Sequence, residues 1–425
     1  MRSLLTAKTV ALGCAYESAM ATLTNPTFPV VFSFFLLPVA TEFGWGRATA
    51  SEGLIVSTIA GAIALPIGGR AVDRWGVRAV LFPGMILFSL ATMAMSLLNG
   101  SIVQLYLLYA VLGFAGAFNA IITYAKLISA WFHKSRGFLL GVALGGGSGI
   151  GGVLAPWLAG YLIDHRGWRE AYVGLGLVLL ICGLPGVLLL SEPPHVHLQR
   201  MGAAQARTTS SQLLGKSASE ALRTSVFWLI FIAQFLVANS TGGSIAHALP
   251  ILQDRGFLEN VAKYALTAFP IAMTIGHVTT GYLMDRFQTP RVGLPMYVSV
   301  LFGLLLLHHG PGMSVVFGPF LMGFGIGSEI GLIAYYTARY FGIRSYAEIY
   351  GYMFACANLA LSIGPFVMGK LYDLSHTYRF ALALFEVTVA ASALLILLLP
   401  RYTYDVSPPG FQSSSSRDST LATES

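Results

Sequence analysis

Long apolar stretches separated by short polar or charged loops run through most of the chain. Residues 79–125, 137–163 and 292–328 contain no Asp, Glu, Lys or Arg. Because roughly 20 apolar residues span the hydrocarbon core as a helix, the first and last stretches are long enough for two crossings each. The pattern predicts an all-α membrane protein with twelve transmembrane helices. They are expected near 11–37, 48–68, 79–98, 103–130, 137–162, 170–190, 225–247, 261–284, 292–309, 314–339, 349–372 and 379–400.

Two sequence patterns occur once in each half of the chain. The first is a charged loop with Gly69, Asp73, Arg74 and Arg78 in one copy and Gly281, Asp285, Arg286 and Arg291 in the other. The second pattern is P-x-x-x-G-x-x-x-D, with Pro156, Gly160 and Asp164 recurring as Pro365, Gly369 and Asp373. Such a long internal repeat in an apolar chain predicts two pseudo-symmetric six-helix bundles. We expect bundles at 1–190 and 225–400, a cytoplasmic linker at 191–224 and a disordered cytoplasmic tail at 401–425.

Composition and charge agree with a multi-pass integral membrane protein. The chain is 55% hydrophobic and 10% charged, against about 25% charged in soluble domains. With the N-terminus inside, 17 of the 25 Lys and Arg residues lie on the cytoplasmic side, so both termini are expected in the cytoplasm. The net charge of +7 then reflects short basic loops at the membrane and does not indicate nucleic-acid binding. A bacterial inner membrane is the expected location.

The duplicated G-x-x-x-D-R loops resemble the signature of the major facilitator superfamily. Within it, EFGW at 42–45 and WFHKSRGFLLGVALGGGSGIGG at 131–152 resemble the branch of monocarboxylate porters and oxalate/formate antiporters. RYFGIRSYAEIYG at 339–351 is similar to the matching loop of the second half in bacterial members. The resemblance implies the major facilitator fold and alternating access, with spans 1, 4, 7 and 10 lining a central cavity.

One position departs from that branch. Members often carry an Arg in span 8, eight residues before the loop Asp, which pairs with the substrate carboxylate. In this chain that position is His277, and the acidic residue often found one turn earlier is replaced by Met273. The permanent positive charge that the resemblance would supply is therefore absent.

The charged loops predict a gate. Asp73 with Arg74 and Arg78 in one half, and Asp285 with Arg286 in the other, could latch the cytoplasmic faces together and break when that side opens. The alternative is that these charges only set topology. Conservation of spacing between the two copies favours the gate, since a bias of charge alone would not require it.

Ionisable side chains inside spans are costly in lipid and mark candidate sites. Glu329, central in span 10, is the predicted proton-coupling residue, and a structural hydrogen bond is the alternative. Lys126 in span 4 is expected to attract a substrate anion or to extend its amine to the interface. His277 could bind substrate and couple protonation, or be a packing histidine. Glu17 in span 1 is a weaker partner for Lys126.

Neutral polar residues complete the expected binding cavity. Asn25 with Pro26 should break span 1 near mid-membrane. The further candidates are Asn119 and Thr123 on span 4, Gln234 and Asn239 on span 7, Tyr335 and Tyr336 on span 10, and Asn358 on span 11. Each of them could instead bond one helix to another.

Glycines in span 5 have two formal interpretations. Gly147-x-Gly149-x-x-Gly152 matches a dinucleotide fingerprint, but that reading needs a preceding strand and an exposed helix start. The run instead lies inside an uncharged apolar stretch. Gly141, Gly145 and Gly149 are four residues apart and predict close approach of another helix.

These observations favour a secondary transporter of a small organic anion. The resemblance implies a monocarboxylate-like substrate, and Glu329 indicates proton coupling. The alternative is an exchanger or exporter of a neutral or cationic solute on the same fold. A membrane enzyme or sensor is disfavoured, because the sequence offers no nucleophile–base pair, metal-ligand spacing or nucleotide loop. We expect no cofactor or metal, a monomer, and a small solute, protons and the lipid bilayer as partners.

Overall fold

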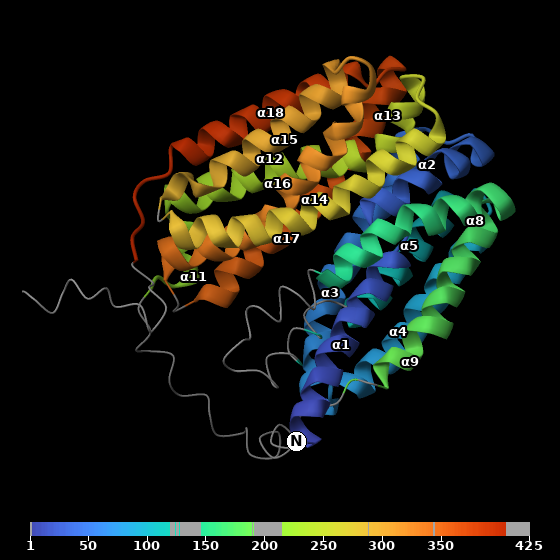
Figure 1. Ribbon diagram of the computed structural model, residues 1–425, viewed down its shortest axis with the longest axis horizontal. Coiled ribbons are helices and arrows are strands. Elements are labelled where there is room, and N and C mark those ends of the chain that lie inside the picture. The colour runs from blue at the N-terminus through green and yellow to red at the C-terminus, as the bar shows by residue number, and fades with distance from the viewer. Residues whose placement is uncertain are drawn as a thin grey trace, which may run out of the picture.

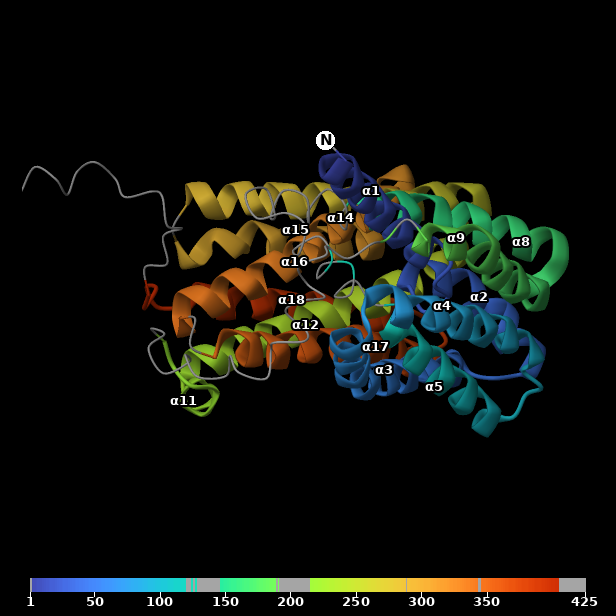
Figure 2. The same ribbon diagram turned by 90° about the horizontal axis from the view of Figure 1, so that it is seen from below.

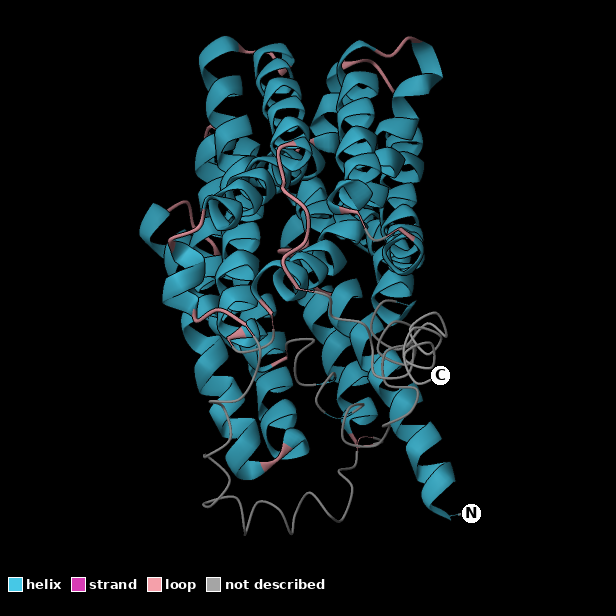
Figure 3. Ribbon diagram, turned by 90° about the vertical axis from the view of Figure 1, so that its left-hand side faces the viewer, coloured by secondary structure: helices cyan, strands magenta, loops and turns pink. Residues whose placement is uncertain are grey.

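The structure is a computed structural model that describes most of the chain. The described residues are 2–119, 124, 127, 146–188, 190, 215–287, 289–342 and 345–404, without the side chains of 2–7, 73, 281, 285, 330 and 347. Within these ranges the chain is helical, and no strand is present (Figure 3).

The N-terminal helices follow the predicted spans. They are α1 (Arg2–Leu23), α2 (Pro29–Phe43), α3 (Arg47–Trp75), α4 (Val77–Ala94), α5 (Ile102–Phe118), α8 (Gly147–Val178) and α9 (Leu184–Val187). The predicted break in span 1 is confirmed, because α1 ends before Asn25 and α2 begins after Pro26. The described part of span 5, and span 6, fall within α8 and the residues that follow it. The chain turns between them at Gly167, whose φ of 79° suits glycine.

The C-terminal helices repeat this arrangement. They are α11 (Ala218–Leu222), α12 (Ser225–Ala246), α13 (Ala248–Asp254), α14 (Glu259–Arg286), α15 (Leu294–His309), α16 (Phe317–Phe341), α17 (Tyr346–Ser375) and α18 (Arg379–Leu397). Among the described residues, 8 helical stretches are long and apolar enough to cross a membrane, and two shorter apolar helices, α2 and α5, accompany them.

The helices form two bundles, blue to green for the N-terminal half and yellow-green to red for the C-terminal half (Figures 1 and 2). The bundles are close together at the end where α2 and α13 lie. They are apart at the end that carries the N-terminus and α11 (Figure 1). Each bundle has a core of buried apolar side chains, and Val30 and Phe34 of α2 pack into the core of the C-terminal bundle. The two-bundle architecture predicted from the internal repeat is therefore present.

Glycines allow α8 to contact helices of both bundles. A β-carbon at Gly151 would lie 2.1 Å from the carbonyl oxygen of Ala19 on α1, within the N-terminal bundle. A β-carbon at Gly149 would lie 2.3 Å from the Oγ1 atom of Thr274 on α14, in the other bundle. The predicted close approach is thus confirmed at Gly149, whereas Gly141 and Gly145 lie outside the described residues.

Candidate functional site

One contact between the bundles is an ion pair at the end where they are close together. Lys263, near the start of α14, places its ammonium 2.6 Å from the Asp164 carboxylate of α8 and 3.1 Å from Glu259 on its own helix. The lysine side chain is only 8% exposed, whereas both carboxylates are 42% exposed. The cation is therefore buried and fully paired, and one of its two partners comes from the opposite bundle. We call this contact the first latch.

A second latch joins α17 to the beginning of α3. The Asp373 carboxylate accepts hydrogen bonds from the backbone N–H of Arg47 (2.9 Å) and of Ala48 (3.0 Å). Gly46, the N-cap of α3, has no side chain to do this. The first N–H groups of a helix lack intrahelical partners and carry partial positive charge, so a carboxylate there is stabilising. Asp373 thus caps a helix of the opposite bundle.

The P-x-x-x-G-x-x-x-D repeat builds both latches. Its two Asp residues, Asp164 and Asp373, supply the carboxylates. A β-carbon at Gly160 would lie 2.7 Å from the Lys263 Cε atom, and one at Gly369 would lie 2.5 Å from the Ala48 nitrogen. Each Gly therefore leaves the space into which the opposite bundle fits. Because the pairs α8–α14 and α17–α3 occupy equivalent places in the two halves, the latches are related by the internal symmetry.

A buried polar network surrounds the second latch. The Arg47 guanidinium donates to the Tyr378 hydroxyl, lies 3.7 Å from the centre of the Tyr372 ring, and is 3.5 Å from Asp254. Behind Tyr378 lies His247, the residue after α12, whose Nδ1 atom is 2.9 Å from the same hydroxyl. The network therefore connects α3 of one bundle to α12, α13, α17 and α18 of the other.

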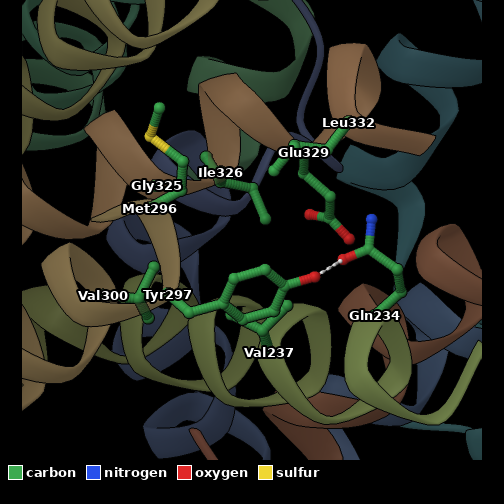
Figure 4. A pocket seen from close by; sticks show the side chains of 9 residues that line it. All are labelled: Gln234, Val237, Met296, Tyr297, Val300, Gly325, Ile326, Glu329 and Leu332. Atoms are coloured by element: carbon green, nitrogen blue, oxygen red, sulfur yellow. Dashed lines mark hydrogen bonds between the residues drawn. The ribbon is translucent and has the colours of Figure 1, made fainter. Parts of the chain in front are cut away.

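Glu329 lies inside the C-terminal bundle, in a small pocket between α12, α15 and α16 (Figure 4). The pocket has a volume of about 10 Å³, which is room for a single water molecule. Tyr297 donates a hydrogen bond of 2.7 Å to the Gln234 side-chain oxygen. The Gln234 amide nitrogen and one Glu329 carboxylate oxygen are buried without partners among the described residues, and the two side chains point toward each other in Figure 4. Apolar side chains form the remaining wall.

His277 and Asn358 flank the contacts between the bundles. Thr274 of α14 meets α8, and His277 follows it by three residues on the same helix face. Ser362 of α17 is hydrogen-bonded to Thr58 of α3, and Asn358 precedes it by four residues. His277 Nδ1 is 2.8 Å from the Met273 carbonyl, and Asn358 donates to the Phe354 carbonyl at 2.8 Å. Both of these hydrogen bonds are within one helix. His277 and Asn358 thus share their helix faces with Thr274 and Ser362, which contact the other bundle.

The remaining neutral candidates make local or interhelical bonds. Asn25 accepts from the Thr27 backbone N–H at 3.0 Å in the break between α1 and α2. Asn239 bonds the Ala360 carbonyl of α17 at 3.2 Å, within its own bundle. Asn119 at the end of α5 accepts from the Tyr124 hydroxyl. The hydroxyl of Tyr335 is 3.5 Å from the Met284 carbonyl. Of these residues, Asn239 matches the interhelical alternative most directly.

The charged-loop residues lie at the ends of α3 and α14 that are opposite to the latches. Arg74 and Arg286 are exposed at the ends of α3 and α14. Arg78 donates to the carbonyl of Leu188, which belongs to the same half. The side chains of Asp73 and Asp285, and the whole of Thr123 and Lys126, lie outside the described residues. Their predicted gating and anion-binding roles stay predictions.

Sequence reasoning did not assign Arg47, His247, Lys263 or Tyr378 to any site. Lys263 and His247 fall at the ends of predicted spans, where a polar residue needs no special explanation. The available signal was the duplicated P-x-x-x-G-x-x-x-D pattern, whose Asp164 and Asp373 end equivalent spans. Searching for basic residues that begin the facing spans would have pointed to Lys263 and Arg47.

Comparisons with known proteins identify related membrane transporters. The profile described as "Major Facilitator Superfamily" matches residues 12–365 and 230–420. The "Uncharacterized MFS-type transporter YcxA" of Bacillus subtilis (strain 168) is 25% identical over 381 residues, which cover 86% of this chain and 90% of that protein. Monocarboxylate transporter 4 of Rattus norvegicus is 26% identical over 392 residues, covering 87% and 79%.

Solved structures agree on the fold. The nucleoside transporter NupG superposes with a TM-score of 0.70 at 16% identity, over 91% of this chain and 98% of that chain. At this identity the likeness concerns the fold alone. The profile match, the apolar helices and the transporter relatives together show that this chain belongs to the Major Facilitator Superfamily and is a multi-pass membrane transporter.

Proposed function

We propose that the protein moves a small organic anion, of monocarboxylate type, across the membrane by proton-coupled alternating access. The observation that carries the alternating-access part is the pair of latches, Lys263 to Asp164 and Asp373 to the start of α3, at the end where the bundles are close. With both termini in the cytoplasm, as the distribution of Lys and Arg favours, this end is external. The structure then corresponds to a state closed to the outside. The segment 191–224 would join the two bundles on the cytoplasmic side of a bacterial inner membrane.

Glu329 is the proposed proton carrier. A carboxyl group with one oxygen unpaired, in an apolar pocket that also holds the unpaired amide of Gln234, is costly when charged and favourable when protonated. Movement of α16 against α12 and α15 during alternation would change access to this pocket, so the carboxyl could take up a proton on one side and release it on the other.

The anion would bind between the bundles. His277 and Asn358 lie on faces directed at the opposite half, and Lys126 is the further candidate cation. Relatives named monocarboxylate transporters, one of them 26% identical over most of its length, support a carboxylate. The second candidate is a neutral or cationic solute, and the observation that favours it is His277, which supplies no permanent charge.

The test uses purified protein in liposomes with an imposed pH gradient. The wild type is expected to accumulate a labelled monocarboxylate when the outside is acidic. Glu329→Gln should abolish accumulation but retain exchange of internal for external solute, because a glutamine cannot carry the proton. Glu17→Gln is the matched control, since Glu17 is also a buried carboxyl without a partner among the described residues. Uphill transport by Glu329→Gln would refute the proton role.

Substrate class is tested separately by counterflow. Liposomes loaded with a small carboxylate are expected to take up labelled carboxylates faster than their neutral amide or alcohol analogues. Complete indifference to the carboxylate group would refute the anion and support the neutral or cationic alternative.

A further inference from the structure

His247 is a fully buried histidine at the boundary between the bundles. Its Nε2 atom is 3.0 Å from the Pro365 carbonyl and 3.4 Å from the Ser51 hydroxyl, which belongs to α3 of the other bundle. Its Nδ1 atom is 2.9 Å from the Tyr378 hydroxyl. One hydrogen bond further along lies Arg47, the first residue of α3 and part of the second latch.

The partners of this ring determine which nitrogen carries hydrogen. The Pro365 carbonyl can only accept, so Nε2 donates to it. In the neutral ring Nδ1 then accepts, and the Tyr378 hydroxyl donates to it. The Tyr378 oxygen in turn accepts from Arg47. While the imidazole is neutral, this chain of hydrogen bonds is complete and every donor in it has an acceptor within the protein.

A recess connects this network to the solution at the latched end. It has a volume of about 550 Å³ and its walls include Tyr372, His376 and Tyr378. Tyr378 therefore lies between water on one side and His247 on the other. A proton can reach the ring if the Tyr378 hydroxyl passes its proton to Nδ1 while its oxygen takes one from hydronium in the recess. The net change is one proton moved from solution to the imidazole.

We propose that His247 is a second proton-binding site of this transporter, loaded from the external side through Tyr378, and that its protonation releases the second latch. The proposal rests on the proposed proton-coupled function, and it assigns the step that opens the outer gate to a residue distinct from Glu329. Proton binding from outside would in this way favour the state in which the carrier can receive external solute.

Protonation disrupts the latch through charge and hydrogen-bond direction. Nδ1 becomes a donor, so the Tyr378 oxygen must accept from an imidazolium and from the Arg47 guanidinium together. Neither nearby carboxylate is free to compensate. The Asp254 carboxylate is 42% exposed and already pairs with Arg47 at 3.5 Å. The Asp373 carboxylate already accepts hydrogen bonds from two backbone N–H groups. Two cations beside one neutral oxygen repel each other in a buried site.

The direction of the effect follows from linkage. The imidazolium is disfavoured while the bundles are latched and is relieved when Arg47 moves away, so the unlatched state binds the proton more tightly. A ligand shifts the equilibrium toward the state that it binds better. Lowering the pH is therefore expected to open the latched end.

The experiment measures conformation without solute. Spin labels on cysteines at Arg166 and Leu258, exposed positions of opposite bundles at the latched end, report their separation by pulsed electron spectroscopy in lipid nanodiscs. The wild type should gain a longer-distance population, at least several-fold, as the pH falls. His247→Gln, which cannot titrate, should lose this response, and His247→Lys should show the longer distance at every pH. The control is His376→Asn, an exposed histidine of the same recess that lies in the left-handed region, which asparagine tolerates.

The outcomes are distinguishable from those of the transport assay. If His247→Gln keeps the full pH response while folding normally by thermal unfolding, the proposal is wrong even if Glu329 carries protons. If anion uptake fails altogether but the distance change depends on His247, then His247 controls the second latch and the proposed substrate is wrong. Tyr378→Phe provides a second measurement, since it keeps the ring but removes the relay, and it should also lose most of the response.

Discussion

The first latch permits a quantitative prediction about the balance between conformations. Asp164→Asn removes the charge that Lys263 meets on the opposite bundle but leaves Glu259 beside the ammonium, so the buried lysine is not left unpaired. A hydrogen bond between charged groups contributes about 1.5–3 kcal/mol. Because the Asp164 side chain is 42% exposed, solvent screening reduces this to about 1–1.5 kcal/mol. The ratio of latched to unlatched molecules should therefore fall by a factor of about 5 to about 12.

The matched control is Glu259→Gln. Glu259 is the other partner of Lys263, with the same exposure, but it lies four residues away on the same helix. The Glu259–Lys263 pair stays together whether or not the bundles separate. Removing it costs about 0.3–0.5 kcal/mol in both conformations, so the ratio of latched to unlatched molecules should be nearly unchanged. A difference between the two variants isolates the contact across the bundles from a general effect of removing an acid near Lys263.

The assay is the distance measurement between labels at Arg166 and Leu258, in a background without the cysteines 14, 182 and 356. Asp164→Asn should raise the longer-distance population, and Glu259→Gln should not. Combining Asp164→Asn with Asp373→Asn should add the two effects, since the latches share no residue. Equal populations in wild type and Asp164→Asn, or equal shifts for the two single variants, would show that Lys263 does not hold the bundles together.

Two further changes test packing and substrate contact. Gly151→Ala places a methyl group 2.1 Å from the Ala19 carbonyl and should lower the stability of the N-terminal bundle by about 1–3 kcal/mol. The measurement is the melting temperature, which should fall. The control is Gly351→Ala, which meets nothing within 4 Å and should be neutral or slightly stabilising. His277→Arg should lower KM for carboxylates by about tenfold relative to neutral analogues. The reason is that a charge-assisted hydrogen bond contributes about 1.5–3 kcal/mol, less the cost of burying the arginine. If the preference for carboxylates over neutral analogues in counterflow is unchanged, His277 does not contact the solute.

The sequence was sufficient for the architecture because the membrane imposes it. Uncharged stretches of 27 to 47 residues have few stable alternatives to helices in lipid, and duplicated charge patterns divided them into two halves. The break of span 1 at Asn25 was predictable for a similar local reason, since Pro26 follows it. These features depend on residues near one another in the chain.

The site was less predictable because its contacts join residues that are far apart. Asp164 and Lys263 are 99 positions apart, and Arg47 and Asp373 are 326 apart. No helical period indicates which acid meets which base across two bundles. Glu329 shows the same limit, since its central position in a span was clear, but its neighbours Gln234 and Tyr297 depend on how α12 and α15 pack. Asn239 bonds the Ala360 carbonyl of α17, a partner that its position in span 7 does not indicate, and its role in the cavity stays a prediction.

The two latches share a symmetric scaffold but differ in chemistry, and this difference suggests a division of roles. The first depends on Lys263, whose charge does not change over the physiological range, so it sets a constant bias toward closure. The second depends on Asp373 and on Arg47, which His247 can oppose once it is protonated. If both latches were titratable, opening would require two separate protonation events. If neither were titratable, the external proton concentration would not affect opening. With one of each kind, a single proton can decide the state of the gate, provided that the constant bias is small enough to be overcome, as the exposure of Asp164 indicates.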